Sequence, residues 1–238
     1  LIHLYSEVLQ KFRLAARGKG PSRKPPEHLK KRVDEFFDPL PFYYEPLEAQ
    51  RTDRVRYPLS AVTQRPMAMY HSWDSQNAWL RQIHSHNPLY LNPRVARAHG
   101  IEDGGWMWVE SQWGRVRCQA SYSEAVEPGT VWTWNAIGKA PGAWGLAPDA
   151  NESRRGFLLN HLISEELPGA GDEGTVSNSD PITGQAAWYD VRVRIYRADD
   201  GEPAQTWPQF EPVPAAPGTK AAHRPRTLAW FAGGGKRP

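Results

Sequence analysis

The clearest strand signal in the chain is Asp103-Gly104-Gly105-Trp106-Met107-Trp108-Val109-Glu110-Ser111-Gln112-Trp113-Gly114-Arg115-Val116-Arg117-Cys118-Gln119-Ala120. Its first three residues are a tight-turn sequence. An apolar run follows, and a second turn at residues 113–114 leads into strict alternation over 115–120, where the arginines face outward and the small apolar side chains face inward. This alternation is typical of a half-buried strand. The stretch therefore predicts two short strands joined by a turn.

Similar strands recur on both sides of this stretch. Residues 57–62 are an apolar strand, residues 131–134 follow the turn sequence at 127–129, and residues 191–196 alternate with Val191, Val193 and Ile195 on one face. Short strands separated by turn signals are typical of an all-β barrel or sandwich. We therefore predict a mainly β fold with short inserted helices, preceded by a partly helical arm.

Helices are predicted for residues 6–16, 27–37, 78–83 and 92–100. Ser6 and Asn92 are suitable N-cap residues, because their side-chain oxygens can accept a hydrogen bond from the first turn. Gly100 suits a helix end. In the third helix, Leu80 and Ile83 are expected to face inward.

Composition divides the chain into three predicted parts: an arm over 1–56, a domain over 57–197, and a Pro/Gly-rich basic tail over 198–238 that is expected to be disordered. The net charge is +3, but residues 11–32 hold nine Lys or Arg against one acid, and residues 212–238 hold five with no acid. The body is therefore acidic, which argues against a domain-wide nucleic-acid footprint. We interpret the basic flanks as solvated and expect no nucleic-acid partner.

Cys118 is the only cysteine. This count excludes an intrachain disulfide and a cysteine-held iron–sulfur cluster within the chain. Its inward position favours a buried small apolar residue over a reactive thiol. The histidines do not have the spacing of a familiar metal site, and no apolar run is long enough to cross a bilayer. Leu1 is not an initiator methionine, and we expect the chain to be cut from a longer protein.

The most polar and aromatic segment is Thr63-Gln64-Arg65-Pro66-Met67-Ala68-Met69-Tyr70-His71-Ser72-Trp73-Asp74-Ser75-Gln76-Asn77. A core strand would be less polar, and a solvated loop would need fewer rings. An arginine offers a planar fork to phosphate, and amide side chains can pair with the edges of heterocycles. The segment therefore suits a large, flat ligand that carries phosphates. The alternative is an aromatic-rich loop that satisfies its own backbone.

An ordered set of short motifs resembles a known module. The set is Thr63-Gln64-Arg65 with His71-Ser72, Asn92-Pro93-x-x-Ala96-x-x-x-Gly100-Ile101-x-Asp103-Gly104, Val109-x-Ser111-x-x-Gly114-x-Val116, Val126-x-Pro128-Gly129-x-Val131, Asn160, and Asp180-Pro181-x-x-Gly184-Gln185. Over residues 57–197 it resembles the C-terminal molybdopterin-dinucleotide-binding domain of the dimethyl-sulfoxide-reductase family of molybdenum and tungsten oxidoreductases. Gly105 departs from the pattern, because many members have Asp at this turn position.

The resemblance implies a double-psi β-barrel that binds bis-(molybdopterin guanine dinucleotide) with molybdenum or tungsten. The cofactor-binding residues that it implies, together with the ligand chemistry of the side chains, are Thr63, Gln64, Arg65, Tyr70, His71, Ser72, Trp73, Gln76, Asn160, Asn178 and Gln185. Asn160 and Gln185 have a simpler alternative as turn residues. Trp132 and Trp134 are interpreted as core or subunit contacts rather than as ligand stackers.

Segments 132–139, 156–163 and 177–181 look most similar to catalytic subunits of quinone-linked sulfite dehydrogenases. Polysulfide, thiosulfate and tetrathionate reductases are similar too, and formate dehydrogenase is a further alternative. The resemblance implies that the metal ligand and an iron–sulfur cluster lie in upstream domains of the same polypeptide, so no catalytic or metal-ligating residue is expected here. The partners that it implies are an iron–sulfur electron-transfer subunit plus a membrane quinone-reactive subunit. The implied location is cytoplasmic and membrane-associated.

A different class of function fits the same composition. The chain has eleven tryptophans, which would suit a non-enzymatic module that binds carbohydrate or nucleic acid through aromatic platforms. That hypothesis predicts aromatic side chains on one exposed face and no requirement for Arg65 or His71. A purely structural assembly domain is the third hypothesis.

Overall fold

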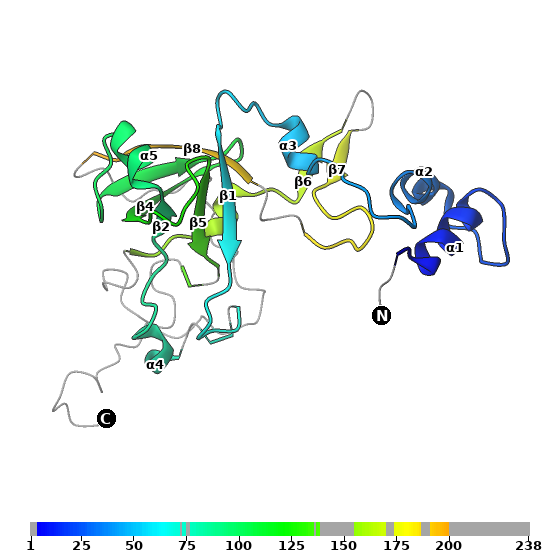
Figure 1. The fold of residues 1–238 in the computed structure, drawn as a ribbon, viewed down its shortest axis with the longest axis horizontal. Helices are drawn as coiled ribbons and strands as arrows, with labels where there is room; N and C mark the ends of the chain where they lie inside the picture. The colour runs from blue at the N-terminus through cyan, green and yellow to red at the C-terminus, as the bar shows by residue number, and fades with distance from the viewer. Residues whose placement is uncertain are drawn as a thin grey trace, which may run out of the picture. The chain divides into compact units, whose positions relative to one another are not determined.

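The computed structural model describes residues 4–71, 73–74, 77–135, 137–138, 155–169, 174–186 and 191–199. The chain divides into two compact units, which we describe separately (Figure 1). The first unit comprises residues 1–51 and 165–188, and the second comprises residues 52–164 and 189–238. Segment 165–188, which the sequence analysis assigns to the 57–197 domain, therefore groups with the arm residues. The predicted tail lies outside the described residues apart from its first two positions.

The second unit is built around a closed six-stranded barrel with the strand order β1-β5-β2-β4-β3-β8. The strands are β1 (Leu59–Gln64), β2 (Leu89–Leu91), β3 (Trp106–Glu110), β4 (Arg115–Tyr122), β5 (Thr130–Trp134) and β8 (Val191–Arg197). Two neighbouring pairs are parallel, β1 with β5 and β2 with β4, and the remaining pairs are antiparallel. The predicted mainly β architecture is confirmed as a barrel.

The core of the barrel follows from the alternation of its strands. Val116, Cys118 and Ala120 of β4 are buried, and Val191, Val193 and Ile195 of β8 are buried in the same cluster. Arg115 and Arg117 lie on the outer face of β4, where their guanidinium groups stack on Trp108 and Trp106 of β3. Cation–π stacking of this kind covers aromatic surface that would otherwise contact water.

Two short α-helices lie in the described part of the second unit. In α5 (Pro93–Ala98), Asn92 caps the first turn by accepting a hydrogen bond from the Arg94 N–H, as predicted. In α4 (Ala78–Arg81), Asn77 accepts from the Trp79 N–H. The expectation that Ile83 faces inward is wrong, because its side chain is 62% exposed. The helix ends at Arg81, too early to place Ile83 on a core-facing turn.

The first unit contains α1 (Glu7–Ala16), α2 (Glu27–Phe36), α3 (Leu47–Arg51) and a two-stranded sheet of β6 (Glu166–Pro168) and β7 (Thr175–Ser177). Ser6 caps α1, as predicted. Arg13 of α1 forms a salt bridge with Asp38, and Phe12 packs edge-on against Phe37. The helices predicted at residues 6–16 and 27–37 are thus confirmed.

Candidate functional site

The C-terminal ends of β1 and β5 meet at one end of the barrel. The two strands are parallel, and Gln64 pairs with Trp134 in the last register position. The Asn135 N–H then donates to the Gln64 carbonyl at 2.9 Å, which extends the pairing by one residue. The loop that follows β1 and helix α4 lie beyond this end, below the barrel in the view of Figure 1. Helix α5 follows the C-terminal end of β2, which runs antiparallel to β5, and therefore lies at the opposite end.

The loop after β1 is held by two buried anchors and two turns. Pro66 and Met69 are buried, and the Met69 N–H donates to the Pro66 carbonyl at 3.2 Å. The Asp74 carboxylate accepts from the Tyr70 N–H at 2.9 Å, and the Trp73 N–H donates to the Tyr70 carbonyl at 3.1 Å. With its backbone held in this way, the loop exposes the side chains of Arg65, Met67, Tyr70, His71 and Trp73.

Three predicted ligand residues form a contiguous cluster on this loop. The Arg65 guanidinium lies 5.4 Å from the centre of the Tyr70 ring, and the Tyr70 and His71 rings meet edge-on at 5.1 Å. All three residues are exposed. His71 has a φ of 50°, a conformation that non-glycine residues adopt uncommonly and that often marks functional sites. The cluster combines a cation, a ring face and an imidazole, which suits an anionic, ring-containing ligand.

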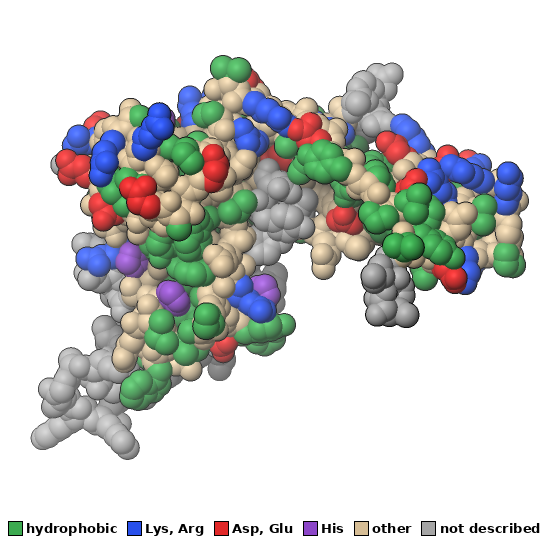
Figure 2. Space-filling model, in the orientation of Figure 1, with side chains coloured by type: hydrophobic (Ala, Val, Ile, Leu, Met, Phe, Trp, Pro, Cys, Tyr) green, Lys and Arg blue, Asp and Glu red, His purple; other side chains and the backbone are tan. Residues whose placement is uncertain are grey.

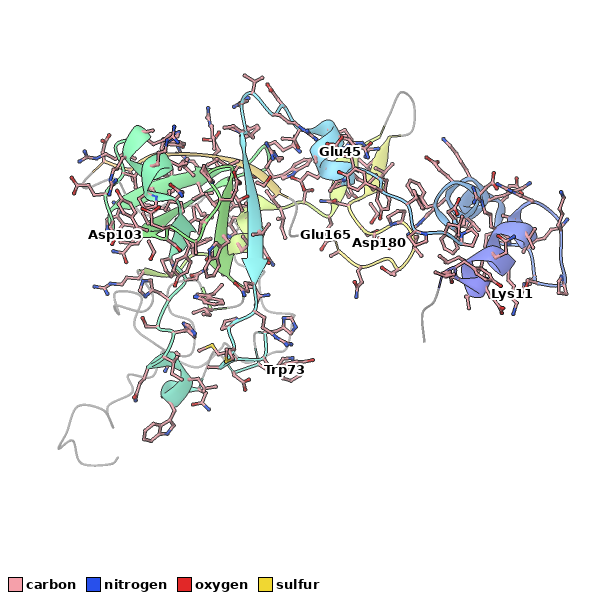
Figure 3. The ribbon with its side chains drawn as sticks, viewed as in Figure 1. Lys11, Glu45, Trp73, Asp103, Glu165 and Asp180 are labelled. Carbon is pink, nitrogen blue, oxygen red and sulfur yellow. The ribbon has the colours of Figure 1, made fainter. Side chains whose placement is uncertain are left out.

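Several aromatic or large apolar side chains of this loop and of α4 are exposed. Tyr70 is 59%, Trp73 71% and Trp79 78% exposed, and Met67 is fully exposed. Figure 3 labels Trp73 on the loop beyond β1, and the same region carries hydrophobic side chains in Figure 2. Exposed large apolar side chains that gather on one region of a surface commonly mark a binding site. The exposure of Tyr70, Trp73 and Trp79 also fits the exposed aromatic side chains that the aromatic-module hypothesis expects.

A further aromatic group includes residues of β2 and β5 on the outer face of the barrel. Tyr90 stacks on Trp132 with 4.1 Å between ring centres, Trp134 meets Trp132 edge-on, and His84 packs against Trp134. The Trp134 indole N–H donates to the Tyr90 hydroxyl. These rings are partly buried against one another. This packing agrees with their interpretation as packing residues rather than ligand stackers.

Asn160 occupies a short 3-10 helix, η2 (Leu159–Leu162), and its side chain is exposed. The segment that leads into it is fixed by Asn87, whose buried carboxamide donates to the Phe157 carbonyl and accepts from the Phe157 N–H. Next to Asn160, burial lowers the pKa of His161, which favours the neutral form of this imidazole.

Asn135 is not among the cofactor-binding residues expected from the sequence. It continues the inward phase of β5, in which Val131 and Thr133 are buried and the tryptophans face outward. Asn135 is 6% exposed, and its buried Oδ1 atom has no hydrogen-bond partner among the described residues. Sequence gives no signal for an unpaired buried amide, because the pattern of 131–135 fits an ordinary strand end.

Two predicted site residues belong to the first unit. The buried Asn178 amide donates to the buried carboxylate of Glu48 at 3.0 Å. Gln185 is exposed, and its N–H donates to Thr183 within a turn organised by Asp180. Partial burial of Asp180 opposes ionisation, but hydrogen bonds from Thr183, Tyr44 and Ile182 outweigh it and lower the pKa of the carboxyl.

The structure therefore brings Gln64, Arg65, Tyr70, His71 and Trp73 together at the end of β1. Thr63 is half-buried within the same strand. Ser72 and Gln76 lie outside the described residues. The role of each as a cofactor ligand stays a prediction. Within the described part of the chain, no group of three His, Cys, Asp or Glu side chains could hold a metal ion, and no helix is long and apolar enough to span a membrane.

Comparison with known proteins defines the class of this domain. Residues 59–173 match the family model described as "Molydopterin dinucleotide binding domain". This range includes the barrel strands β1 to β5, the loop after β1, and η2, whereas β8 lies beyond it. The chain thus carries a domain of the molybdopterin dinucleotide-binding family, and the resemblance inferred from its motifs is confirmed.

The chain is similar to parts of several larger proteins. The chain is 67% identical over 98% of its length to a sulfite dehydrogenase subunit of Allochromatium vinosum, and 28% identical over 81% of its length to dopamine dehydroxylase of Eggerthella lenta. It spans 24% and 18% of these relatives, respectively. Acetylene hydratase from Pelobacter acetylenicus has a similar fold, with a TM-score of 0.50 and 22% identity over 69% of this chain and 22% of that chain.

Proposed function

We propose that this chain is the cofactor-binding part of the catalytic subunit of a molybdopterin-dependent oxidoreductase that oxidises sulfite to sulfate. The supporting observation is the exposed Arg65–Tyr70–His71 cluster at the joint end of β1 and β5, inside a domain that matches the dinucleotide-binding family. The substrate proposal rests on the 67% identity to the sulfite dehydrogenase subunit, of which the chain spans about a quarter.

The residues at this end of the barrel fit a molybdopterin dinucleotide. Such a cofactor carries phosphates, a guanine and pterin rings with amide-like edges. Arg65 can pair with phosphate oxygens, because a guanidinium offers a planar fork of donors. The exposed Gln64 and His71 can exchange hydrogen bonds with ring edges, and the unpaired Oδ1 of Asn135 can accept one.

When bound, the cofactor supplies a metal centre that transfers an oxygen atom and two electrons. The contribution of this chain is to bind and orient the cofactor and to exclude water around it. Tyr70 and Trp73 suit the last task, since both expose aromatic surface on the same loop. Within this proposal, the barrel is a double-psi β-barrel and the cofactor is the bis-(molybdopterin guanine dinucleotide) form with molybdenum or tungsten.

The wider assembly is proposed on the same basis. We propose that iron–sulfur clusters pass the electrons to a partner iron–sulfur subunit, then to a membrane quinone-reactive subunit, on the cytoplasmic side. A polysulfide, thiosulfate or tetrathionate reductase, or a formate dehydrogenase, is the alternative within the family. Turnover of sulfite with a quinone analogue by the purified natural gene product tests the first choice. Turnover of tetrathionate, thiosulfate, polysulfide or formate instead of sulfite would replace it.

A further inference from the structure

The two buried asparagines in the described part of the second unit differ in how their carboxamides are paired. One of them, Asn87, uses both ends of its carboxamide, at 3.1 Å and 3.0 Å, on the backbone of Phe157. Asn135, in contrast, leaves its Oδ1 without a partner among the described residues, although the residue is only 6% exposed. A buried polar atom without a partner is costly, and native proteins rarely leave one unexplained.

The position of Asn135 identifies the region to which this atom belongs. Its backbone N–H is bonded to the Gln64 carbonyl, so Asn135 is fixed beside the residue that precedes Arg65. The Asn135 side chain continues the inward phase of β5. The preceding inward residue, Thr133, already donates its hydroxyl to the Pro88 carbonyl. Asn135 therefore lies at the end of the barrel where the Arg65–Tyr70–His71 cluster is presented, and its unpaired oxygen belongs to this end.

We propose that the carboxamide of Asn135 is a binding residue for the 2-amino-4-oxopyrimidine edge that pterin and guanine share. This edge presents N–H donors beside a carbonyl acceptor, and a carboxamide offers the complementary acceptor and donor. The inference rests on the proposed function, and it adds Asn135 to the residues of this chain that contact the cofactor. It explains why a buried amide stands where an apolar residue would fill the strand end at lower cost.

The test compares two leucine variants in the full natural gene product: Asn135→Leu, and Asn87→Leu as the matched buried control. Each is prepared with the cofactor and, from a host that cannot make molybdopterin, without it. For Asn135→Leu we expect an unchanged or higher unfolding midpoint in the cofactor-free protein, and a release of metal and guanine nucleotide that is about tenfold faster from the loaded protein. For Asn87→Leu we expect a lower midpoint in the cofactor-free protein, because two backbone groups lose their partner.

A second measurement distinguishes the two ring sources. Titration of the cofactor-free protein with GMP reports the guanine edge alone. Weaker GMP binding by Asn135→Leu assigns Asn135 to guanine, whereas unchanged GMP binding with faster loss of the metal-bearing pterin assigns it to pterin. Asn135→Ala is measured in parallel, since it removes the amide without adding bulk.

Two results would overturn the inference while leaving the proposed function intact. The first is that both Asn135 variants release the cofactor as slowly as the loaded wild-type protein does. The second is that the cofactor-free Asn135 variants lose as much stability as Asn87→Leu does, or fail to fold. That result would show that the role of Asn135 is structural. A wild type that holds neither metal nor guanine nucleotide would overturn both the inference and the proposed function.

Discussion

The carboxamide of Asn87 forms a two-point pair with the backbone of Phe157, and Gly138 lies directly against this pair. A Cβ atom on Gly138 would overlap the Phe157 carbonyl oxygen and would lie 2.6 Å from the Asn87 Oδ1. This three-residue contact fixes the start of the segment that carries Asn160. Because the nearest atom is backbone, the clash cannot be relieved by a side-chain rotation.

Gly138→Ala should therefore destabilise the barrel by about 2 kcal/mol or more, as expected for overpacking against an immovable backbone. The control is Gly129→Ala, whose added Cβ meets only the far end of the flexible Glu127 side chain. Chemical denaturation of both variants measures the difference. Equal midpoints for the two variants would show that the Phe157 segment is not held as described.

Arg65→Ala and His71→Ala should lower cofactor occupancy without unfolding the protein. Both side chains are exposed, and exposed substitutions usually change the free energy of unfolding by less than about 0.5 kcal/mol. His71→Gly should also keep its stability, because glycine tolerates the φ of 50° without strain. Metal and guanine nucleotide per protein, together with the unfolding midpoint, provide the two readouts.

The matched control for these variants is Arg94→Ala, an exposed arginine of α5 at the opposite end of the barrel. It removes the same charge but no proposed contact, so occupancy should stay at the wild-type level. Normal occupancy and normal turnover in the Arg65 and His71 variants would reject the assignment of these two residues.

Cys118 should not react with thiol reagents in the folded protein. Its side chain is fully buried, and burial raises the pKa of the thiol well above its usual range, so almost no thiolate forms. Labelling by iodoacetamide should appear only in denaturant and should follow the unfolding transition. Rapid labelling of native protein at neutral pH would contradict the buried position.

Asp180 should make the turn at 180–185 sensitive to acid. Its pKa is lowered from the ordinary 3.8, so its contribution to stability is complete above that value and is lost as pH falls through the lower folded-state pKa. Hydrogen exchange of the Ile182 and Thr183 amides, which donate to this carboxylate, should accelerate relative to the intrinsic rate as the pH falls below 3.8. In Asp180→Asn the protection should be lower at all pH values and should lose this acid-dependent step.

Much of the fold could be predicted from the sequence, because local signals and the buried pattern agree. The alternation at residues 115–120 and 191–196 indicated the correct inward faces, and the capping roles of Ser6 and Asn92 are confirmed. The inward position of Ile83 was wrong, since a four-residue helix has no second turn on which to extend its apolar face. The grouping of 165–188 with the arm also has no local signal, because it depends on contacts such as Asn178 with Glu48.

The candidate site could be predicted in part, because its loop also has a local signal in the sequence. The chemistry of residues 63–77 indicated a ligand loop, and the structure places its described polar and aromatic members together at one end of the barrel. Asn135 was missed because its significance lies in an unpaired atom, which appears only when the neighbours are known.

The central claim is that this domain binds a molybdopterin dinucleotide. The most direct test is the content of molybdenum, tungsten and acid-released guanine nucleotide in the purified natural gene product. We predict about one metal atom and about two guanine nucleotides per polypeptide, as expected for the bis-dinucleotide cofactor. Well-folded protein with neither metal nor nucleotide would contradict the claim and would favour the aromatic binding module.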